Sequence, residues 1–440
     1  IANNNDSAHL TLKLKDKAGN IITENLPVKF VVKLDGETKE SGFTLSALKH
    51  EADHSYSVDF KATKAGKYTF TPNVAKRDLD LTPLCTIKVK PNLDGDLHAT
   101  LTSDKQNLDV DEPAKLTLTI FDAGDNPISG LKDNLKLVAK IKKDDKEVET
   151  TDKISFSTVK AEGKGQYTVT FSGQKQEVYT IAICYKKHEL NQTTPLQIEI
   201  ETKNFDETKS GINPEKDVLT TDDILNLPII FKDKYDNGVR HIETRKHQFS
   251  VNLNNTDVDA SAIIRDFTYD GATAGKYKAT FKPKKTGTYK ITLTIDGKEI
   301  VCSKDIIVNP GKPSDKHSKI TPAKSQITAD DTKIDLELNI YDAKGNGIPH
   351  LEANNRVSFQ VINPAGGDGQ VDSFTFRSST IGEYKASFHA TKAGIYKVYF
   401  IADKIELCKS DSKIAKITVV PGKVDNTTSK LTSDKAELIA

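Results

Sequence analysis

The feature that most constrains this chain is a repeated aromatic pattern. The spacing Tyr-x3-Phe-x7-Tyr occurs four times in 440 residues and takes up eight of the 13 tyrosines. The first tyrosines of the four copies are Tyr56, Tyr167, Tyr277 and Tyr384. Successive copies therefore lie about 110 residues apart, and a nearly fixed period of this length indicates a tandem array of similar structural units.

Two further landmarks keep the same phase. The first is an aspartate followed within a few residues by an Asn or Gly turn, at Asp16–Asn20, Asp122–Asn126, Asp233–Gly238 and Asp342–Gly347. The second is an eight-residue segment that precedes three of these turns, LTSDKQNL (101–108), INPEKDVL (212–219) and ITPAKSQI (320–327). It returns as LTSDKAEL at 431–438, where six of eight residues match the first copy. We interpret this segment as the leading strand of each repeat, which the first repeat lacks.

Apolar and polar residues alternate in the segments between these landmarks. In 9–14, 116–120 and 336–340 this period of two places leucines on one face of a half-buried strand. Such runs recur every ~8–12 residues, and no segment has a convincing amphipathic helical pattern. About seven strands in ~110 residues is the size of an immunoglobulin-like sandwich. The sequence therefore predicts an all-β fold of tandem immunoglobulin-like β-sandwich repeats.

The phase of the landmarks also predicts the domain boundaries. We expect a first repeat at 1–92 without its first strand, full repeats at 93–203, 204–310 and 311–422, and the leading strand of a truncated next repeat at 423–440. Short Pro-containing linkers at 91–96, 310–313 and 421–423 leave little slack between sandwiches. The expected array is an elongated, semi-rigid rod of roughly 120–160 Å. We expect 431–438 to be poorly ordered, to pack irregularly, or to pair with the vacant edge of another copy.

The second tyrosine of each pattern stands at the head of a late strand, just after a turn. This is the position of a tyrosine corner, in which the phenol bonds back to the upstream backbone. We therefore assign a structural role, rather than a ligand-binding role, to Tyr68, Tyr179, Tyr289 and Tyr396.

Composition and motifs argue against several functions. Lys and Arg total 63 against 62 for Asp and Glu, so a net charge of +1 provides no bulk attraction to nucleic acid or to anionic lipid. No apolar run approaches the ~18 residues of a membrane helix, which predicts no membrane contact within this segment. The standard hydrolase, metalloprotease and nucleotide-binding motifs are absent, so we expect neither an enzyme nor a cofactor. The chain has no Met and begins with Ile1, which favours a processed or excised piece.

Acidic pairs that follow the leading strands are a candidate metal site. Oxygen ligands near a repeat junction could hold calcium and stiffen the array. The favoured alternative is that an aspartate in a turn bonds to its own backbone, since Ca²⁺ takes six to eight oxygens. The candidates are Asp109, Asp111, Asp222, Asp223, Asp330 and Asp331.

The cysteines fall one to a repeat, at Cys85, Cys184, Cys302 and Cys408. Cysteines in separate sandwiches are too far apart for a disulfide, which needs Cα atoms within ~7 Å. We expect four small buried apolar residues. Unpaired thiols weigh modestly against an oxidising exterior.

Segments such as 308–349 resemble a known family, the bacterial Ig-like repeats of intimin and invasin adhesins, and the resemblance covers essentially all 440 residues. A Pro-Gly linker, a leading strand, an Ala-Asp turn, an alternating strand and an Asp-x-x-Gly-Asn turn follow in that order. The resemblance implies a stalk on the outer membrane that projects a receptor-binding domain from the bacterial cell surface. Neither the barrel nor the tip domain of that family is in this chain, so a host-cell receptor or other protein partner would bind elsewhere.

The back half of each repeat favours a second hypothesis. Residues 275–300 resemble a filamin repeat, and filamin-like rods are cytoplasmic scaffolds that bind partner peptides at exposed sandwich edges. A third class, an enzyme or its carbohydrate-binding accessory, has least support because the chain has no Trp for a sugar platform. The leading hypothesis is a non-catalytic structural stalk segment of a surface adhesin, and the alternative is an intracellular scaffold.

Overall fold

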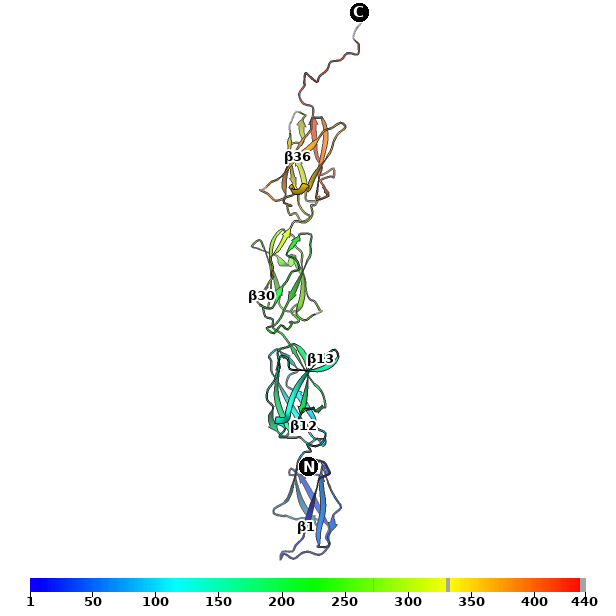
Figure 1. The fold of residues 1–440 in the computed structure, drawn as a ribbon, viewed down its shortest axis with the longest axis vertical. Helices are drawn as coiled ribbons and strands as arrows, with labels where there is room; N and C mark the ends of the chain where they lie inside the picture. Colours follow the sequence, from blue (N-terminus) through cyan, green and yellow to red (C-terminus); the bar gives the residue numbers. More distant parts are fainter. Residues whose placement is uncertain (272, 330–332, 378, 436–440) are drawn as a thin grey trace. The chain divides into compact units, whose positions relative to one another are not determined.

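The computed structural model describes residues 1–271, 273–329, 333–377 and 379–435. Within these residues the chain forms strands and three short 3₁₀ helices, and no α-helix. It divides into two compact units, Ile1–Lys203 and Asn204–Ala440, each of which contains two β-sandwiches (Figure 1). The all-β, immunoglobulin-like fold predicted from the repeat is confirmed.

The first sandwich packs a four-stranded sheet against a five-stranded one. The first sheet, of order β1-β6-β4 with β5 also on β6, contains β1 (Ser7–Lys13), β4 (Phe43–Leu45), β5 (Lys49–His50) and β6 (Ser55–Ala62). The second, of order β3-β2-β7-β8 with β9 also on β7, contains β2 (Val28–Leu34), β3 (Glu37–Thr38), β7 (Gly66–Val74), β8 (Arg77–Asp78) and β9 (Cys85–Val89). Strand β1 is thus an edge strand.

The second sandwich has two six-stranded sheets and the 3₁₀ helix η1 (Lys132–Asn134). One contains β10 (His98–Ser103), β12 (Ala114–Phe121), β15 (Ile154–Phe156), β16 (Lys160–Gly163), β17 (Gln166–Gly173) and β20 (Asn191–Gln192). The other contains β11 (Asn107–Asp109), β13 (Leu135–Lys143), β14 (Lys146–Thr150), β18 (Glu177–Tyr185), β19 (His188–Glu189) and β21 (Leu196–Glu201).

The third sandwich has a four-stranded and a six-stranded sheet and the 3₁₀ helix η2 (Ala260–Ala262). The smaller sheet contains, in order, β22 (Gly211–Ile212), β24 (Leu225–Ile230), β28 (Lys276–Phe281) and β27 (Ile264–Tyr269). The larger contains β23 (Val218–Thr220), β25 (His247–Leu253), β26 (Thr256–Val258), β29 (Gly287–Ile295), β30 (Lys298–Val301) and β31 (Ile306–Asn309).

The fourth sandwich follows the same plan, with the 3₁₀ helix η3 (Ala353–Asn355). One sheet contains, in order, β32 (Lys319–Pro322), β34 (Ile334–Asn339), β37 (Glu383–His389) and β36 (Gln370–Phe376). The other contains β33 (Gln326–Thr328), β35 (Val357–Ile362), β38 (Gly394–Ala402), β39 (Ile405–Leu407) and β40 (Ala415–Val420).

The leading segment is not one strand, and this corrects the sequence interpretation. In the second repeat β10 ends at Ser103 and pairs antiparallel with β12, whereas β11 begins at Asn107 and pairs parallel with β21 in the opposite sheet. The break falls at Asp104, whose N–H donates to the carbonyl of Lys115 while its carboxylate accepts the Lys115 N–H at 2.8 Å. These bonds end the first strand and let the chain cross between sheets.

The alternating residues fill the space between the sheets. In β1, Leu10 and Leu12 are buried while Thr11 and Lys13 are exposed. The core of the second sandwich likewise joins leucines of β12 to isoleucines of β18 and β21 from the facing sheet. Burial of these two apolar faces is the main stabilising contribution of each sandwich.

Phenylalanine and the second tyrosine of each repeat meet edge to face in that core. The ring centroids are 4.9, 5.7, 5.1 and 5.5 Å apart, in the pairs Phe60–Tyr68, Phe171–Tyr179, Phe281–Tyr289 and Phe388–Tyr396. This geometry suits the ring quadrupoles and recurs because the spacing of the pattern recurs. The aromatic pattern therefore positions the same core contact four times.

Candidate functional site: the junctions between repeats

The aspartate turn of the second repeat is a compact loop at 122–126, directly after β12. The Asp122 carboxylate accepts the backbone N–H of Gly124 and of Asn126, each at 2.9 Å. The Asn126 carboxamide donates to both carboxylate oxygens, at 2.9 and 3.0 Å. An aspartate that bonds to its own downstream backbone fixes a turn, and here it also fixes the rotamer of the asparagine.

The fixed asparagine contacts the preceding repeat. Asn126 Nδ2 donates to the carbonyl of Thr63 at 2.9 Å, and its Oδ1 accepts the N–H of Ala65 at 2.8 Å. Lys64 Nζ donates back to the carbonyl of Gly124 at 2.6 Å. The carboxamide thus pairs with the turn between β6 and β7 as a peptide group would, and Asn126 is only 3% exposed.

The linker between these repeats joins the same carboxylate. The N–H of Asn92 donates to Asp122 Oδ2 at 2.8 Å. Asp122 is completely buried, so its charge depends on these donors rather than on water. One aspartate therefore connects the linker, its own turn and the asparagine that contacts the previous sandwich.

The fourth repeat builds the same junction from different neighbouring residues. Asn346 Nδ2 donates to the carbonyl of Lys284 at 3.0 Å, and Asn346 Oδ1 accepts the N–H of Thr286 at 3.3 Å. Asp342 Oδ2 accepts the N–H of Gly311 at 3.1 Å and the hydroxyl of Thr221 at 2.6 Å. The Asp-x3-Asn turn therefore makes the same asparagine contacts at both of these junctions.

The other two repeats contain the same internal turn. Asn20 Nδ2 donates to Asp16 Oδ2 at 2.9 Å, and Asn237 Nδ2 donates to Asp233 Oδ2 at 2.7 Å. Asp16 and Asn20 are exposed, in contrast to Asp122 and Asn126. We call the four loops at 16–20, 122–126, 233–237 and 342–346 the junction loops.

Hydrogen bonding keeps the buried junction aspartates ionised. Burial acts to raise the pKa of Asp122, but the N–H groups of Asn92, Asn126 and Gly124 outweigh burial and lower it below the ordinary value. The pKa of Asp342 is lowered in the same way, against burial, by Thr221, Asn346 and Gly311. A negative charge is thus part of each junction at neutral pH.

The described calcium candidates lie in or next to turns, and three of them accept backbone N–H groups. Asp109 Oδ1 accepts the N–H of Val110 at 2.9 Å, and Asp222 Oδ2 accepts that of Lys312 at 2.9 Å. Asp223 Oδ2 accepts the N–H and the hydroxyl of Thr220, at 2.7 and 2.8 Å. Asp111 has φ +65° in a turn after β11. Among the residues that the structure describes, no group of three or more His, Cys, Asp or Glu could hold an ion. Asp330 and Asp331 lie outside those residues.

Both tyrosines of each pattern bond to backbone. The second tyrosines donate to the carbonyl four residues upstream, at 2.9 Å for Tyr68, 3.1 Å for Tyr179, 2.7 Å for Tyr289 and 2.7 Å for Tyr396. The first tyrosines each bridge a carbonyl and an N–H of a loop; Tyr167 donates to Ile128 at 2.7 Å and accepts from Leu131 at 3.0 Å. This bridging role of the first tyrosines was not predicted from the sequence.

The cysteines differ from the expected four buried residues. Only Cys408 is buried, Cys184 and Cys302 are half-buried, and Cys85 is exposed on β9; all four are free thiols. Burial raises the pKa of Cys408 to about 11. Cys85 lies on a short strand whose first residues face solvent, so the expectation of burial is wrong there.

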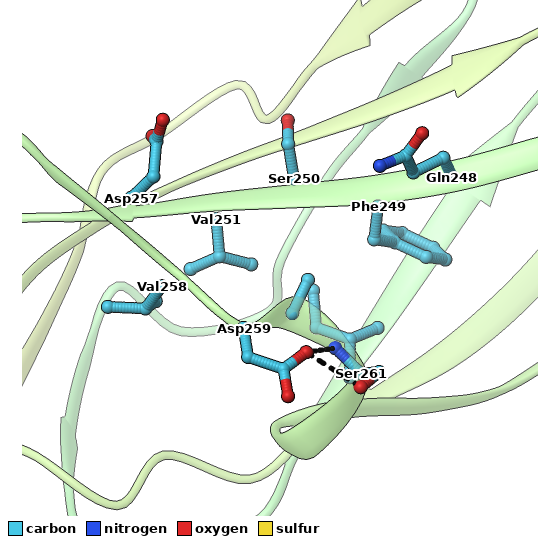
Figure 2. A pocket seen from close by; sticks show the side chains of 10 residues that line it. Gln248, Phe249, Ser250, Val251, Asp257, Val258, Asp259 and Ser261 are labelled. Carbon is cyan, nitrogen blue, oxygen red and sulfur yellow. Dashed lines mark hydrogen bonds between the residues drawn. The ribbon is translucent and has the colours of Figure 1, made fainter.

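A pocket of about 520 Å³ opens between β25, β26 and η2 in the third sandwich (Figure 2). Its carboxylates are already hydrogen-bonded. Asp259 accepts the N–H and hydroxyl of Ser261 at 3.0 and 2.7 Å, and Asp257 accepts from Asn252 at 3.2 Å. These bonds cap η2 and join the β25–β26 hairpin, so we assign the pocket no ligand.

The sequence predicts the turns of the junction loops but not the contacts that they make with the preceding repeat. The missed residues are Asn126 and Asn346, and the signal was the same Asp-x3-Asn spacing in all four repeats. Among the described residues, no helix is both long and apolar enough to cross a membrane.

A scan against models of protein families finds no match. Among solved structures, the chain is similar to the Escherichia coli adhesin FdeC, with a TM-score of 0.52 and 17% identity over 76% of this chain and 99% of that one. It also matches Yersinia pseudotuberculosis InvD, with a TM-score of 0.42 and 15% identity over 73% and 96% of the two chains. The bacterial integrin-binding protein invasin matches with a TM-score of 0.40 and 15% identity over 74% and 60%. The likeness to FdeC shows the fold: a tandem array of immunoglobulin-like β-sandwiches.

Proposed function

We propose that this chain is a non-catalytic stalk segment of a bacterial cell-surface adhesin. The observation that carries the proposal is the junction chemistry. A buried, ionised aspartate and an asparagine four residues later connect adjacent sandwiches through direct hydrogen bonds to backbone, at 122–126 and at 342–346. A protein whose task is reach needs stiff joints between its repeats, whereas a flexible linker of the same length would let them reorient. The fold that it shares with the adhesin FdeC supports the same proposal.

In this proposal the partners are a protein or host-cell receptor, bound by regions outside these residues, and the location is the external side of the outer membrane. The sandwiches contribute length and stiffness and carry out no reaction. Calcium and other cofactors have no role in it.

Small-angle X-ray scattering of the chain tests whether the joints between its sandwiches are stiff. A compact globule of 440 residues has a radius of gyration of about 22 Å, whereas a stiff row of four sandwiches about 140 Å long has one of about 40 Å. A radius of gyration close to the globular value would contradict a stalk. A radius of gyration close to the rod value would support stiff joints if it is smaller in the Asn126→Ala and Asn346→Ala variants than in the original chain.

The free thiols favour one alternative, an intracellular filamin-like scaffold that binds peptides at sandwich edges. Antibodies raised against this chain separate the two locations. Labelling of intact source cells supports the surface stalk. Labelling only after permeabilisation would contradict the surface role and support the scaffold.

A further inference from the structure

Both Asn-Gly dipeptides of the chain lie at the ends of junction loops. They are Asn237–Gly238 and Asn346–Gly347, and no other asparagine in the 440 residues is followed by glycine. The junction asparagines of the first two repeats are followed instead by Ile21 and Pro127. The four junction loops share their internal turn but differ in this next residue, which decides whether the asparagine can react with its own backbone.

Packing selects glycine at these two positions. A Cβ at 347 would overlap the carbonyl oxygen of Ile381, and a Cβ at 238 would overlap that of Ala274. The backbone of a later loop passes so closely that no side chain fits between. The third and fourth repeats therefore keep a reactive dipeptide because their fold needs the glycine.

An asparagine followed by glycine can lose its side-chain amide without an enzyme. The backbone nitrogen of the glycine attacks Cγ of the asparagine, the Cγ–Nδ2 bond breaks, and the proton of the backbone amide leaves with Nδ2 as ammonia. Water then opens the resulting succinimide ring at either carbonyl, which gives an aspartate or an isoaspartate. Glycine favours the attack because it has no side chain to hinder it, whereas proline excludes it because its nitrogen carries no proton.

The backbone nitrogen that would attack Asn346 takes no part in the hydrogen bonds of its turn. Tyr341 and Gly347 form an isolated antiparallel bridge. The two hydrogen bonds of this bridge are made by the residues on either side of the pair, at 2.9 and 3.0 Å. Tyr341 and Gly347 are thus a non-hydrogen-bonded pair, and the bridge does not occupy the Gly347 N–H.

The closed junction restrains the other reactant, the Asn346 side chain. Its Nδ2 donates to the two oxygens of Asp342, at 3.1 and 2.9 Å, and to the carbonyl of Lys284 at 3.0 Å. Its Oδ1 accepts the N–H of Thr286 at 3.3 Å. Ring closure turns the carboxamide and breaks these bonds. The reaction therefore proceeds from the open junction, at a rate proportional to the population of that state.

We propose that Asn346 is a site of spontaneous deamidation and that the modification keeps its junction open. The product has a carboxylate where Nδ2 donated, so the Lys284 carbonyl loses its donor and a second negative charge meets Asp342. An isoaspartate product also lengthens the backbone of the turn. Pro127 excludes the reaction in the second repeat, so that junction opens and closes without chemical change. The modification needs only water, and it does not depend on where the chain is located.

Peptide mass spectrometry of the full chain, after incubation at mildly alkaline pH for increasing times, tests the site. Peptides that contain Asn237 or Asn346 should gain the difference in mass between a hydroxyl and an amino group. Peptides that contain Asn20 or Asn126 should keep their mass over the same period. No gain at Asn346, or an equal gain at Asn126, would overturn the proposal.

Pro127→Gly is the matched variant because it transfers the dipeptide to the junction of the first two repeats. Pro127 is exposed and glycine adds no side chain, so the second sandwich should keep its fold. Asn126 should convert in this variant and not in the original chain. A stable Asn126 in this variant, while Asn346 of the same molecules converts, would contradict the role of the following residue. The reverse change, Gly347→Pro, does not fit beside the Ile381 carbonyl.

Asp342→Ala tests whether the junction restrains the reaction. It removes two of the three bonds that Asn346 Nδ2 makes, so conversion of Asn346 should accelerate at least about fivefold. Peptides from β34 and β37 should keep their protection from hydrogen exchange, which would establish that the fourth sandwich remains folded. Unchanged or slower conversion in this folded variant would contradict the restraint.

Hydrogen exchange of the converted chain tests the lasting effect. The Thr286 N–H is bonded to Asn346, so peptides that cover 284–287 should exchange at least about fivefold faster after conversion. Asn346→Asp, which has the same side chain as one product, should show the same change. Peptides that cover 63–66 should be unaffected in both samples. Unchanged exchange at 284–287 in fully converted chain would overturn the claim that deamidation keeps the junction open.

Discussion

Replacement of Asn126 by alanine should loosen the junction between the first two repeats without unfolding either of them. The substitution removes the bonds to Thr63 and Ala65, at 2.9 and 2.8 Å, as well as those to Asp122. Each neutral hydrogen bond contributes a net ~0.5–1.5 kcal/mol, so the two bonds to the first repeat are together worth about 1–3 kcal/mol. The equilibrium constant for opening of the junction should therefore rise by a factor of about five to about 150.

Amide hydrogen exchange measures this opening directly. The N–H of Ala65 is bonded to Asn126 Oδ1, so peptides that cover 63–66 should exchange faster in the variant by that factor. Peptides from β12 and β17 should keep their protection, which would establish that the second sandwich remains folded.

Asn20→Ala is the matched control because its loop has the same internal bonds but is exposed. It removes the 2.9 Å bond from Asn20 to Asp16, so any general effect of loosening a junction loop appears in both variants. The effect on the turn at 63–66 should appear only in Asn126→Ala. Unchanged exchange at 63–66, or equal acceleration by Asn20→Ala, would refute the assignment of Asn126 to the junction.

Other predictions concern the tyrosines, the thiols and calcium. Tyr167→Phe leaves two buried backbone groups without a partner, so in urea unfolding it should cost about 1–3 kcal/mol and more than Tyr179→Phe, which loses one bond; equal losses would contradict the bridging role. Burial raises the pKa of three tyrosines to about 12 from an ordinary value of about 10, so the stability that they contribute is complete below pH ~10 and lost as pH rises towards 12. These three are Tyr179, Tyr277 and Tyr384. As the pH rises, the absorbance of ionised tyrosine and the circular dichroism of the fold should therefore change together. Ionisation of all tyrosines near pH 10 while the chain stays folded would contradict the raised pKa values. Cys85 should be alkylated much faster than Cys408, which is buried and has a pKa raised to about 11; similar rates by mass spectrometry would mean that the fourth sandwich opens readily. The thermal unfolding midpoint of the chain should be the same in calcium and in chelator. A higher midpoint in calcium would indicate that the acidic turns bind the metal.

Much of the fold follows from periodicity in the sequence. The recurrence of Tyr-x3-Phe-x7-Tyr predicts the number of sandwiches because each repeat must place the same aromatic contact in the same core. The alternation around Leu10 and Leu12 predicts β1 because its period matches the pleat of a strand. Both features depend on residues that are close together in the chain, so they can be recognised from the sequence alone.

What could not be predicted depends on distant neighbours. The segment 101–108 gives no local sign that Asp104 ends a strand, because the bonds that end it come from Lys115 on another strand. The spacing of Asp122 and Asn126 indicates a turn, but the Thr63 carbonyl that the asparagine contacts is 63 residues away. The exposure of Cys85 likewise depends on what covers β9 rather than on the residues beside it.

The bonds that Asn126 and Asn346 make across their junctions all end on main-chain atoms. The turns that they contact have different sequences, Thr-Lys-Ala at 63–65 and Lys-Lys-Thr at 284–286. Lys64 and Thr221 of the preceding repeats each add one side-chain bond at their own junction, but the asparagine contact itself is indifferent to side chains on that side. Such a contact places little demand on co-adaptation between neighbours. Recombination in the gene could then duplicate, delete or shuffle whole repeats, and each new pair would join as the old pairs did. Length would become a trait that selection can adjust through the number of repeats.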